Sequence, residues 1–478
     1  MPSSSSTRQQ RSCRRSTSSL SKAALATTAA AALALVASSV PQVQGAAFEP
    51  PGNQVLLGMW FDPADPYYDS PATINQKLGY NVPVFQIAQS IPLPAYNYTT
   101  GAGGAAPENN IERSGTDAAV FLTVYPTTWD AVTTADLESL AKQIYDYQAN
   151  SNRTVFLRYA PEMQGTWMTY GQQPTAFLTG WQNMYTTIRQ IAPETILVWA
   201  PNTPQGYPYG QQTAFAALDA ADQALLDTNN NGELDADDDA IAPYYPGDPY
   251  VDWIGLSIYY KGIPSDTQNT EQPDGYCAQV MNGTNPESGV NITNWYTDYC
   301  AAKPDKACMF AEAGAAFHTD DDGTATQEQL QQAWLKDCYT NTSLYQDFPR
   351  LKMVMHFEYE KIETANDGSD DDRDYRLTNN SVILNEFVAD LQSAGTLFSW
   401  AQSRALPTSI SSAGAPAATN SDGNSVIQAI TATTRAKPTT FPSLFGTTSD
   451  GTQRAEWAEL GIVVAAGMVG AWTVMRTL

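Results

Sequence analysis

Basic residues and histidine are scarce in this chain. Its 478 residues include 25 Lys and Arg and 2 His against 50 Asp and Glu, which gives a formal net charge of −25. A chain this acidic repels nucleic acid and anionic lipid, so neutral substrates are the expected partners. Cysteine is also rare, and none of the five is spaced with a histidine as zinc ligands are, which argues against a metal–thiolate site.

The N-terminal segment lacks acidic residues. It carries four arginines within its first fifteen residues, then a weakly apolar stretch over 23–37 and small residues near position 45. This pattern predicts a secretory signal over residues 1–45. Six Asn-x-Ser/Thr sequons agree with secretion and predict a glycoprotein, at Asn97, Asn152, Asn282, Asn291, Asn341 and Asn379.

Removal of residues 1–45 leaves four cysteines, at Cys277, Cys300, Cys308 and Cys338. An even number of cysteines in a secreted protein favours disulfides. Three pairings are open. The more local choice joins Cys277 to Cys300 and Cys308 to Cys338, and this is the pairing that we expect.

The C-terminus lacks a hydrophobic run long enough to cross a membrane comfortably. The apolar run Leu460–Met475 reaches about 24 Å at ~1.5 Å per residue, whereas a hydrocarbon core is ~30 Å thick. Small residues at 449–451 and a polar spacer precede it, so residues 451–478 are typical of a glycolipid-anchor signal, with a transmembrane helix as the alternative. The Ser/Thr/Ala-rich segment 396–450 has few aromatic residues and predicts a flexible stalk. The expected location is therefore secreted or at the cell surface, with membrane contact only through this anchor.

Between these segments, residues 46–395 alternate β-rich runs with amphipathic helical patterns, which predicts a parallel sheet covered by helices. A Gly-x-Gly-x-x-Gly turn after the first strand is missing, which lowers the alternative of a doubly wound open sheet. Eight runs suggest a closed (β/α)8 barrel. The expected strands are Val55–Phe61, Val82–Ala88, Ala119–Tyr125, Thr154–Tyr159, Ile196–Ala200, Val251–Ile258, Cys308–Glu312 and Leu351–Phe357, and the expected helices are Asp136–Ala149, Thr175–Ile191, Thr213–Leu226, Gln327–Tyr339 and Ile383–Ala394.

Two glutamates follow strand-forming runs at the places where a barrel carries its chemistry. Glu162 follows the fourth expected strand and Glu312 ends the seventh, 150 residues later. That separation fits strands four and seven, because catalytic groups of such barrels lie at the C-terminal ends of strands. The pair is typical of a retaining glycosidase, in which one carboxylic acid protonates the leaving oxygen and a second carboxylate attacks the anomeric carbon.

The segments around both glutamates resemble glycoside hydrolase family 26, best known for β-mannanases, and within it the secreted fungal branch. The resemblance covers approximately Val55 to Gln392. Two positions next to Glu162 differ from the family pattern, Pro161 in place of His and Gln164 in place of Asn. The matching residues are Arg158, Glu162, Met163, Gly165, Trp167 and Tyr170, then Trp199–Asn202 and Tyr245–Trp253, and finally Glu312 and Gly314.

The resemblance implies that Glu162 is the acid/base and Glu312 the nucleophile. Burial and the neighbouring carboxylate are expected to raise the pKa of Glu162. Arg158 precedes Glu162 by four residues, so both side chains can point the same way from a strand, and the guanidinium can hold Glu312 charged. The further substrate-binding candidates are Trp167 and Trp199 as sugar-stacking platforms, Asn202, Tyr259 or its neighbour Tyr260 as a donor to the nucleophile, and His318 in a loop expected to line the cleft.

An acidic loop over 227–238 fits the calcium loop of an EF-hand, with glycine at its sixth position and a final aspartate in place of glutamate. Only one flanking helix is expected, so a full helix pair is absent from the pattern. The alternative is a hydrated acidic turn. The expected ligands of a structural calcium ion, which catalysis does not require, are Asp227, Asn229, Asn231, Glu233, Asp235 and Asp238.

Three functions fit these patterns. The first is a retaining endo-β-glycanase, acting as a monomer on β-mannan or a related wall polysaccharide. The second is a surface glycoprotein that binds wall polysaccharide without turnover. The third is a transglycosylase, because sugar can replace water in resolving the same covalent intermediate. A protein without turnover need not keep both glutamates and Arg158, so their presence together favours an enzyme.

Overall fold

The computed structural model describes residues 46–62, 70–92, 111–321 and 323–405. The expected signal over 1–45, the stalk from position 406 onward and the anchor over 451–478 lie outside these residues. The folded part continues past the expected boundary at 395, because the short strand β12 (Phe398–Ser399) pairs with the first strand of the barrel. Within the described residues, no helix is long and apolar enough to cross a membrane.

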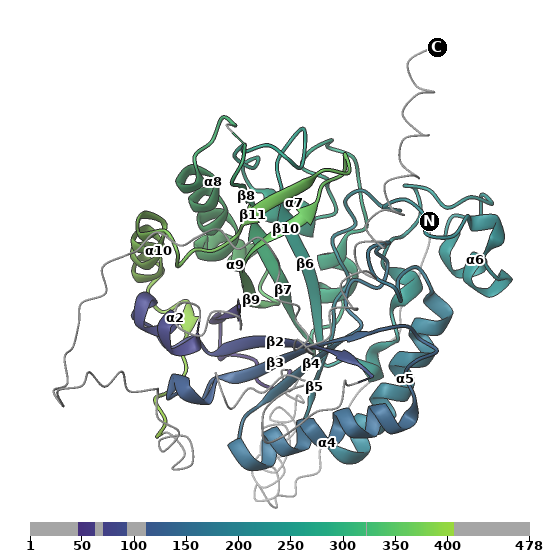
Figure 1. The fold of residues 1–478 in the computed structure, drawn as a ribbon, viewed down its shortest axis with the longest axis horizontal. Helices are drawn as coiled ribbons and strands as arrows, with labels where there is room; N and C mark the ends of the chain where they lie inside the picture. Colours follow the sequence, from purple (N-terminus) through teal and green to yellow (C-terminus); the bar gives the residue numbers. More distant parts are fainter. Residues whose placement is uncertain (1–45, 63–69, 93–110, 322, 406–478) are drawn as a thin grey trace, which may run out of the picture. The chain divides into compact units, whose positions relative to one another are not determined.

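Eight parallel strands close into a barrel, as the sequence predicts (Figure 1). Each strand pairs with the next along the chain, and the last pairs back with the first over six residue positions. Each of the eight barrel strands overlaps its expected run, so the (β/α)8 fold is confirmed. The barrel strands are β1 (Val55–Phe61), β2 (Val84–Ile91), β3 (Ala119–Pro126), β4 (Val155–Tyr159), β5 (Ile196–Trp199), β6 (Trp253–Tyr260), β7 (Ala307–Ala315) and β9 (Leu351–Glu358).

Helices follow most of the strands. The expected helix over 213–226 is the one that differs clearly, because it divides into the 3₁₀ turn η2 (Phe215–Ala217) and a short helix, α6. Asp219 caps α6 by accepting hydrogen bonds from the backbone N–H groups of Ala221 and Asp222. An N-cap residue is extended, as Asp219 is here, so the helix cannot continue back through it. The α-helices are α2 (Pro71–Leu78), α4 (Thr134–Ser151), α5 (Pro174–Ile191), α6 (Ala220–Leu226), α7 (Tyr276–Met281), α8 (Gln327–Trp334), α9 (Thr342–Asp347) and α10 (Ser381–Ser393); the other short helices are η1 (Glu112–Ser114), η3 (Ala242–Tyr244), η4 (Asp248–Tyr250), η5 (Tyr296–Ala301) and η6 (Leu335–Thr340).

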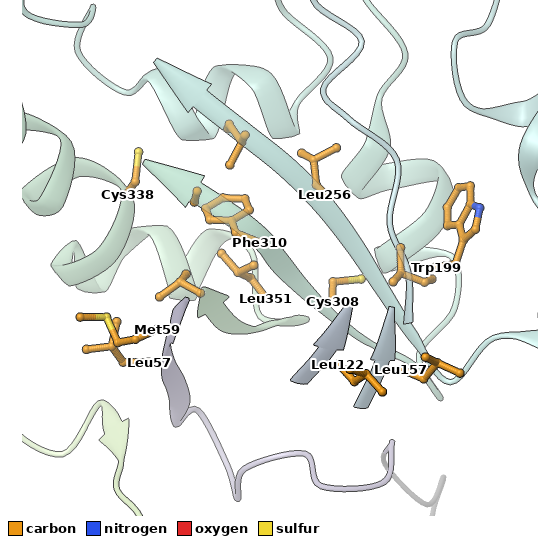
Figure 2. Close-up of a cluster of buried hydrophobic side chains, with 14 of the residues drawn as sticks. Leu57, Met59, Leu122, Leu157, Trp199, Leu256, Cys308, Phe310, Cys338 and Leu351 are labelled. Atoms are coloured by element: carbon orange, nitrogen blue, oxygen red, sulfur yellow. The ribbon is translucent and has the colours of Figure 1, made fainter. Parts of the chain in front are cut away.

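Alternate side chains of each strand enter two separate apolar layers, as the two-residue period of a strand requires. One set fills the barrel interior, for example Phe156, Val198 and Met309. The other set packs against the surrounding helices, and Figure 2 shows part of it. Members labelled there include Leu57, Leu122, Leu157, Trp199, Leu256, Phe310 and Leu351.

The expected disulfide pairing is wrong. The structure joins Cys277 to Cys338, linking α7 to η6, and Cys300 to Cys308, linking η5 to β7. The second bridge spans a sequence separation of only 8, so it is the most local pair available. Once η5 turns directly into β7, Cys300 has its partner, and Cys277 and Cys338 are left for each other.

A second, antiparallel sheet lies beside the C-terminal ends of the barrel strands. It consists of β8 (Phe317–His318), β10 (Glu360–Thr364) and β11 (Asp370–Asp374), in the order β10-β11-β8. Because β8 follows β7 and the β10–β11 hairpin follows β9, the sheet extends the barrel at the end where both glutamates lie (Figure 1).

Candidate active site

Glu162 lies on the loop directly after β4, in a backbone conformation that few residues adopt. Its φ is 55°, in the left-handed region, and two residues earlier Ala160 has φ 45°. A non-glycine residue held there costs about 1–3 kcal/mol and is found mainly at functional sites. Two hydrogen bonds hold it: Glu162 N–H donates to the carbonyl of Ala200 at 3.0 Å, and Gly165 N–H donates to the carbonyl of Glu162 at 2.9 Å. The fold thus fixes the direction of this carboxyl group.

A β-bulge turns Glu312 into the barrel. In β7 Met309 and Ala311 face the interior, so alternation alone places Glu312 on the helix-facing side with Phe310. The pairing with β6 shifts at this point, from Leu256 opposite Phe310 to Ser257 opposite Glu312, which makes Ala311 an extra residue. Bulges of this kind re-aim side chains next to active sites.

Arg158, on β4, contacts both glutamates. Its Nη1 lies 2.5 Å from Glu312 Oε2, and its Nη2 lies 3.8 Å from Glu162 Oε1 and donates to Ser257 Oγ at 2.6 Å. The side chain is fully buried. Burial by itself lowers the pKa of Arg158, but the charges around it, Glu312 first, raise it overall, so the guanidinium stays charged. One buried cation therefore contacts both carboxyl groups.

The surroundings of the Glu162 carboxyl group favour its protonated form. Burial raises its pKa, and the nearby charge of Glu312 adds to the rise. Arg158 and hydrogen bonds from Ser257 and Trp167 oppose it without reversing it, and Trp167 Nε1 donates to Glu162 Oε2 at 2.7 Å. A carboxyl group with a raised pKa is suited to give and take a proton near neutral pH.

Tyr259, not Tyr260, faces Glu312. The Tyr259 hydroxyl donates to Glu312 Oε1 at 2.5 Å. Burial, followed by the charge of Glu312, raises the pKa of Tyr259, which keeps its proton on the oxygen. Tyr260 points to the other side of β6, where its hydroxyl pairs with Thr270 Oγ1 at 2.8 Å. The choice that the sequence left open is settled by strand alternation.

Trp167 is an exposed aromatic residue of the predicted site, with 46% of its surface open to solvent. The Trp167 ring lies over Gly165, where an added Cβ would approach the indole to 2.4 Å. A glycine is therefore required beneath the ring. The rings of Trp167 and Tyr209 pack in a T-shape, with their centroids 5.1 Å apart. An exposed face and a polar edge bound to Glu162 are what a sugar-stacking platform needs, and this role stays a prediction.

Two predicted substrate-binding residues do not reach the cleft. Trp199 is fully buried on the helix-facing side of β5, and its Nε1 donates to the carbonyl of Tyr244 at 2.9 Å (Figure 2). His318 is also fully buried, with Nδ1 2.5 Å from Asp371 Oδ2 and Nε2 2.8 Å from the carbonyl of Lys261. Neither ring is open to a ligand in this structure, because Trp199 packs against Tyr245 and Tyr299 and the two nitrogens of His318 are already paired.

Asn202 lies on the loop after β5, next to the site through its bridge to Ser257. Its Oδ1 accepts the backbone N–H of Thr203 at 2.8 Å. The buried Gln164 donates to the carbonyl of Asn202 at 2.8 Å, so the glutamine that departs from the family pattern braces this loop. A direct contact of Asn202 with substrate stays a prediction.

The acidic loop over 227–238 folds around its own backbone N–H groups. Asp227 accepts from Asn231 and Gly232, and Asp238 Oδ1 accepts from Thr228 at 2.7 Å. Gly232 has φ 89°, as the sixth position of a calcium loop requires.

The side chains of the other predicted calcium ligands also hydrogen-bond within the loop, at Asn229, Asn231 and Asp235, and Glu233 donates through its backbone. Among the described residues, one group of three possible metal ligands lies close enough together to share an ion: Cys277, Asp337 and Cys338. Its two cysteines form a disulfide with each other, so they are not available as thiolate ligands. The loop's carboxylate oxygens are not in this group, so calcium binding would require them to move closer to one another. It stays a prediction, which a calcium titration of the unfolding temperature would test.

Sequence reasoning missed several residues beside the site. Ser257 pairs with Arg158 from the facing strand, and a lone serine in a strand carries no signal of that role. The β10–β11 hairpin adds Lys361, Glu363 and Tyr375, whose hydroxyl donates to Glu363 Oε2 at 2.7 Å. Alternating charged residues, Lys361 and Glu363 in one strand and Asp371 and Arg373 in the other, are the trace of this face in the sequence.

No protein-family model and no curated protein matches the chain. Solved structures do align with it. An endo-β-1,4-mannanase double mutant from Cellulomonas fimi aligns over 73% of this chain and 72% of its own at 12% identity, with a TM-score of 0.43. The GH26 domain of an endo-β-mannanase/endo-β-glucanase from Prevotella bryantii aligns over 64% of this chain and 84% of its own at 16% identity, with a TM-score of 0.34. Function therefore has to be argued from the site itself.

Proposed function

We propose that the protein is a glycoside hydrolase. The observation that carries this proposal is the contact of one buried guanidinium with two glutamates at the C-terminal end of a (β/α)8 barrel. More particularly, we propose a retaining endo-β-glycanase similar to glycoside hydrolase family 26, acting on β-mannan or a related wall polysaccharide. The motif matches around Glu162 and Glu312 support the finer assignment.

In the first step, Glu162 donates its proton to the glycosidic oxygen while a carboxylate oxygen of Glu312 attacks the anomeric carbon. The bond to the leaving sugar breaks and an ester to Glu312 forms. In the second step, Glu162, now ionised, takes a proton from water, and the hydroxide displaces Glu312. Tyr259 and Arg158 hold the nucleophile in place and stabilise its charge before attack and after release.

Hydrolysis assays on a set of polysaccharides test this proposal. The purified chain is incubated with β-mannan, glucomannan, xylan and β-1,3- and β-1,4-glucans, and released reducing ends are measured beside a Glu312→Ala control. Release from one polymer that disappears in the control supports the glycanase and names its substrate class. A folded protein that releases nothing from any polymer excludes simple hydrolysis and favours wall binding or sugar transfer.

The pH dependence should respond to Trp167. The indole N–H stabilises the ionised form of Glu162, so its removal in Trp167→Phe raises the pKa of Glu162 further. Because the first step needs protonated Glu162, activity falls as pH rises through that pKa, and the alkaline limb of kcat should move to higher pH in the variant. A KM increase from lost stacking is expected alongside. A pH–rate profile with an unmoved alkaline limb contradicts the role of Glu162 as the acid.

We further propose that the protein acts outside the cell, released or held at the surface by a C-terminal lipid. The sequence patterns over 1–45 and 451–478 support this, and the two disulfides agree with an oxidising compartment. Mass spectrometry of the mature chain, reading its first residue and its C-terminal modification, tests both ends.

A further inference from the structure

The β10–β11 hairpin presents a charged face. In β10 Lys361 and Glu363 share one face by strand alternation, whereas Ile362 between them is 43% exposed on the other. Their cross-strand partners on β11 are Arg373, opposite Lys361, and Asp371, opposite Glu363. Arg373 is only 1% exposed, whereas Lys361 on the same face keeps 28% of its side chain exposed.

This face covers the end of the barrel beside the nucleophile. The Nζ of Lys361 lies 5.0 Å from the centre of the Phe357 ring, and Tyr375 meets Tyr259 edge-on at 5.4 Å. Tyr259 in turn hydrogen-bonds Glu312. One aromatic layer therefore separates the hairpin from the Glu312 carboxylate.

A second lysine joins the first there. Lys261, directly after β6, lies 3.0 Å from Glu363 Oε2, and Lys361 lies 2.6 Å from Oε1 of the same carboxylate. The Nζ of Lys261 is 5.7 Å from the centre of the Tyr259 ring. The side chains of Lys261 and Lys361 are 36% and 28% exposed, so each lysine is partly open to solvent.

The carboxylate of Glu363 has more hydrogen-bond donors around it than it can pair with fully. Glu363 also accepts from Arg373 Nη1 at 2.9 Å and from the Tyr375 hydroxyl at 2.7 Å. Each ammonium has three N–H donors, and among the described residues each lysine has this one ion-pair partner. Donors therefore remain on both lysines for a ligand.

The electrostatic setting agrees with this geometry. Burial by itself lowers the pKa of Lys361, but the charge of Glu363, with smaller contributions from Glu312 and Glu162, raises it overall. Lys361 is thus charged and lies within the field of both glutamates. In a chain with a net charge of −25, two partly exposed lysines therefore converge on one carboxylate beside the candidate site.

We propose that Lys261 and Lys361 form a subsite for an acidic substituent of the substrate, so that the preferred glycan carries a uronic acid carboxylate, or a sulfate of similar charge, close to the bond that is cleaved. This inference rests on the proposed glycanase function and narrows it. It departs from the neutral substrate that overall charge predicts, because recognition depends on the local field and not on the sum over the chain.

Binding to an inactive chain tests the subsite independently of turnover. The full chain carrying Glu312→Gln is titrated calorimetrically with β-1,4-linked xylo- and manno-oligosaccharides that bear glucuronic acid, with their carboxyl-reduced counterparts and with sulfated analogues. We expect at least one acidic series to bind about 10-fold more tightly than its neutral counterpart, with the preference falling as salt rises. The carboxylate and sulfate arms tell the two sources of charge apart.

Lysine variants complete the experiment. Lys261→Met and Lys361→Met keep the aliphatic stems and leave Glu363 paired with Arg373, so both are expected to fold. Each should reduce the preference for acidic ligands, whereas Lys142→Met on the outside of α4 should not. Equal loss of acidic and neutral binding, or no preference at the start, overturns the subsite. Acidic binding without hydrolysis by the unaltered chain leaves the subsite standing and overturns the proposed reaction instead.

Discussion

Glu162→Ala and Glu312→Ala should both lose polysaccharide hydrolysis. Added azide should restore turnover of an activated aryl glycoside in both variants, with a different glycosyl azide as the product of each. Loss of the acid/base lowers kcat about 10²–10⁴-fold on a polymer, and loss of the nucleophile removes about 10⁴-fold or more. An aryl glycoside with a good leaving group needs no acid, so Glu162→Ala still forms the ester to Glu312. Azide needs no base to displace that ester, and the product should keep the β configuration.

In Glu312→Ala the azide occupies the space of the missing carboxylate and attacks the anomeric carbon directly, with Glu162 as the acid. A single displacement inverts the centre, so the product should be the α-glycosyl azide. Proton NMR of the two products distinguishes the roles. Glu138→Ala, on the exposed side of α4, is the control and should keep full activity. The reverse result, the α-azide from Glu162→Ala and the β-azide from Glu312→Ala, would show that the two roles are assigned wrongly.

The barrel was predictable because its strands are continuous apolar runs that alternate with amphipathic helices. Strand alternation could also have decided more of the site than it did. In β6 Trp253 faces the interior, so Tyr259 follows it inward and Tyr260 cannot. In β5 Val198 faces the interior, so Trp199 belongs to the helix-facing layer. Alternation counted from one interior residue settles the choice between Tyr259 and Tyr260 and places Trp199 on the helix-facing side.

Other features depend on pairings that have no local signal. The bulge at Ala311 reverses the parity of β7, and only the register with β6 reveals it. His318 is enclosed because β11, more than fifty residues later, brings Asp371 to its ring. The resemblance pairs Glu312 with Arg158, and the structure has the two in contact, whereas alternation within its own strand would have turned Glu312 away from Arg158.

Arg158→Met should damage both stability and catalysis. The side chain is fully buried and its removal leaves two buried carboxyl groups without their shared cation, which costs about 3–5 kcal/mol. Without the guanidinium, the two carboxyl groups repel each other and one of them holds a proton more tightly. The nucleophile is then less often ionised, and kcat should fall on the order of 10²–10³-fold. Urea unfolding and steady-state kinetics below the transition measure the two effects separately.

Arg153 supplies the matched control. It is also buried, just before the other end of β4, and its Nε lies 2.6 Å from Glu112 Oε1. Arg153→Met should lose comparable stability while the molecules that remain folded keep their kcat. Arg158→Lys should recover part of the stability but little of the rate, because an ammonium is a point charge that cannot span both carboxyl groups as the planar fork does. Arg153→Met is expected to destabilise the protein and leave kcat intact. If Arg158→Met did the same, the guanidinium would have a structural role only, and another group would have to keep Glu312 ionised.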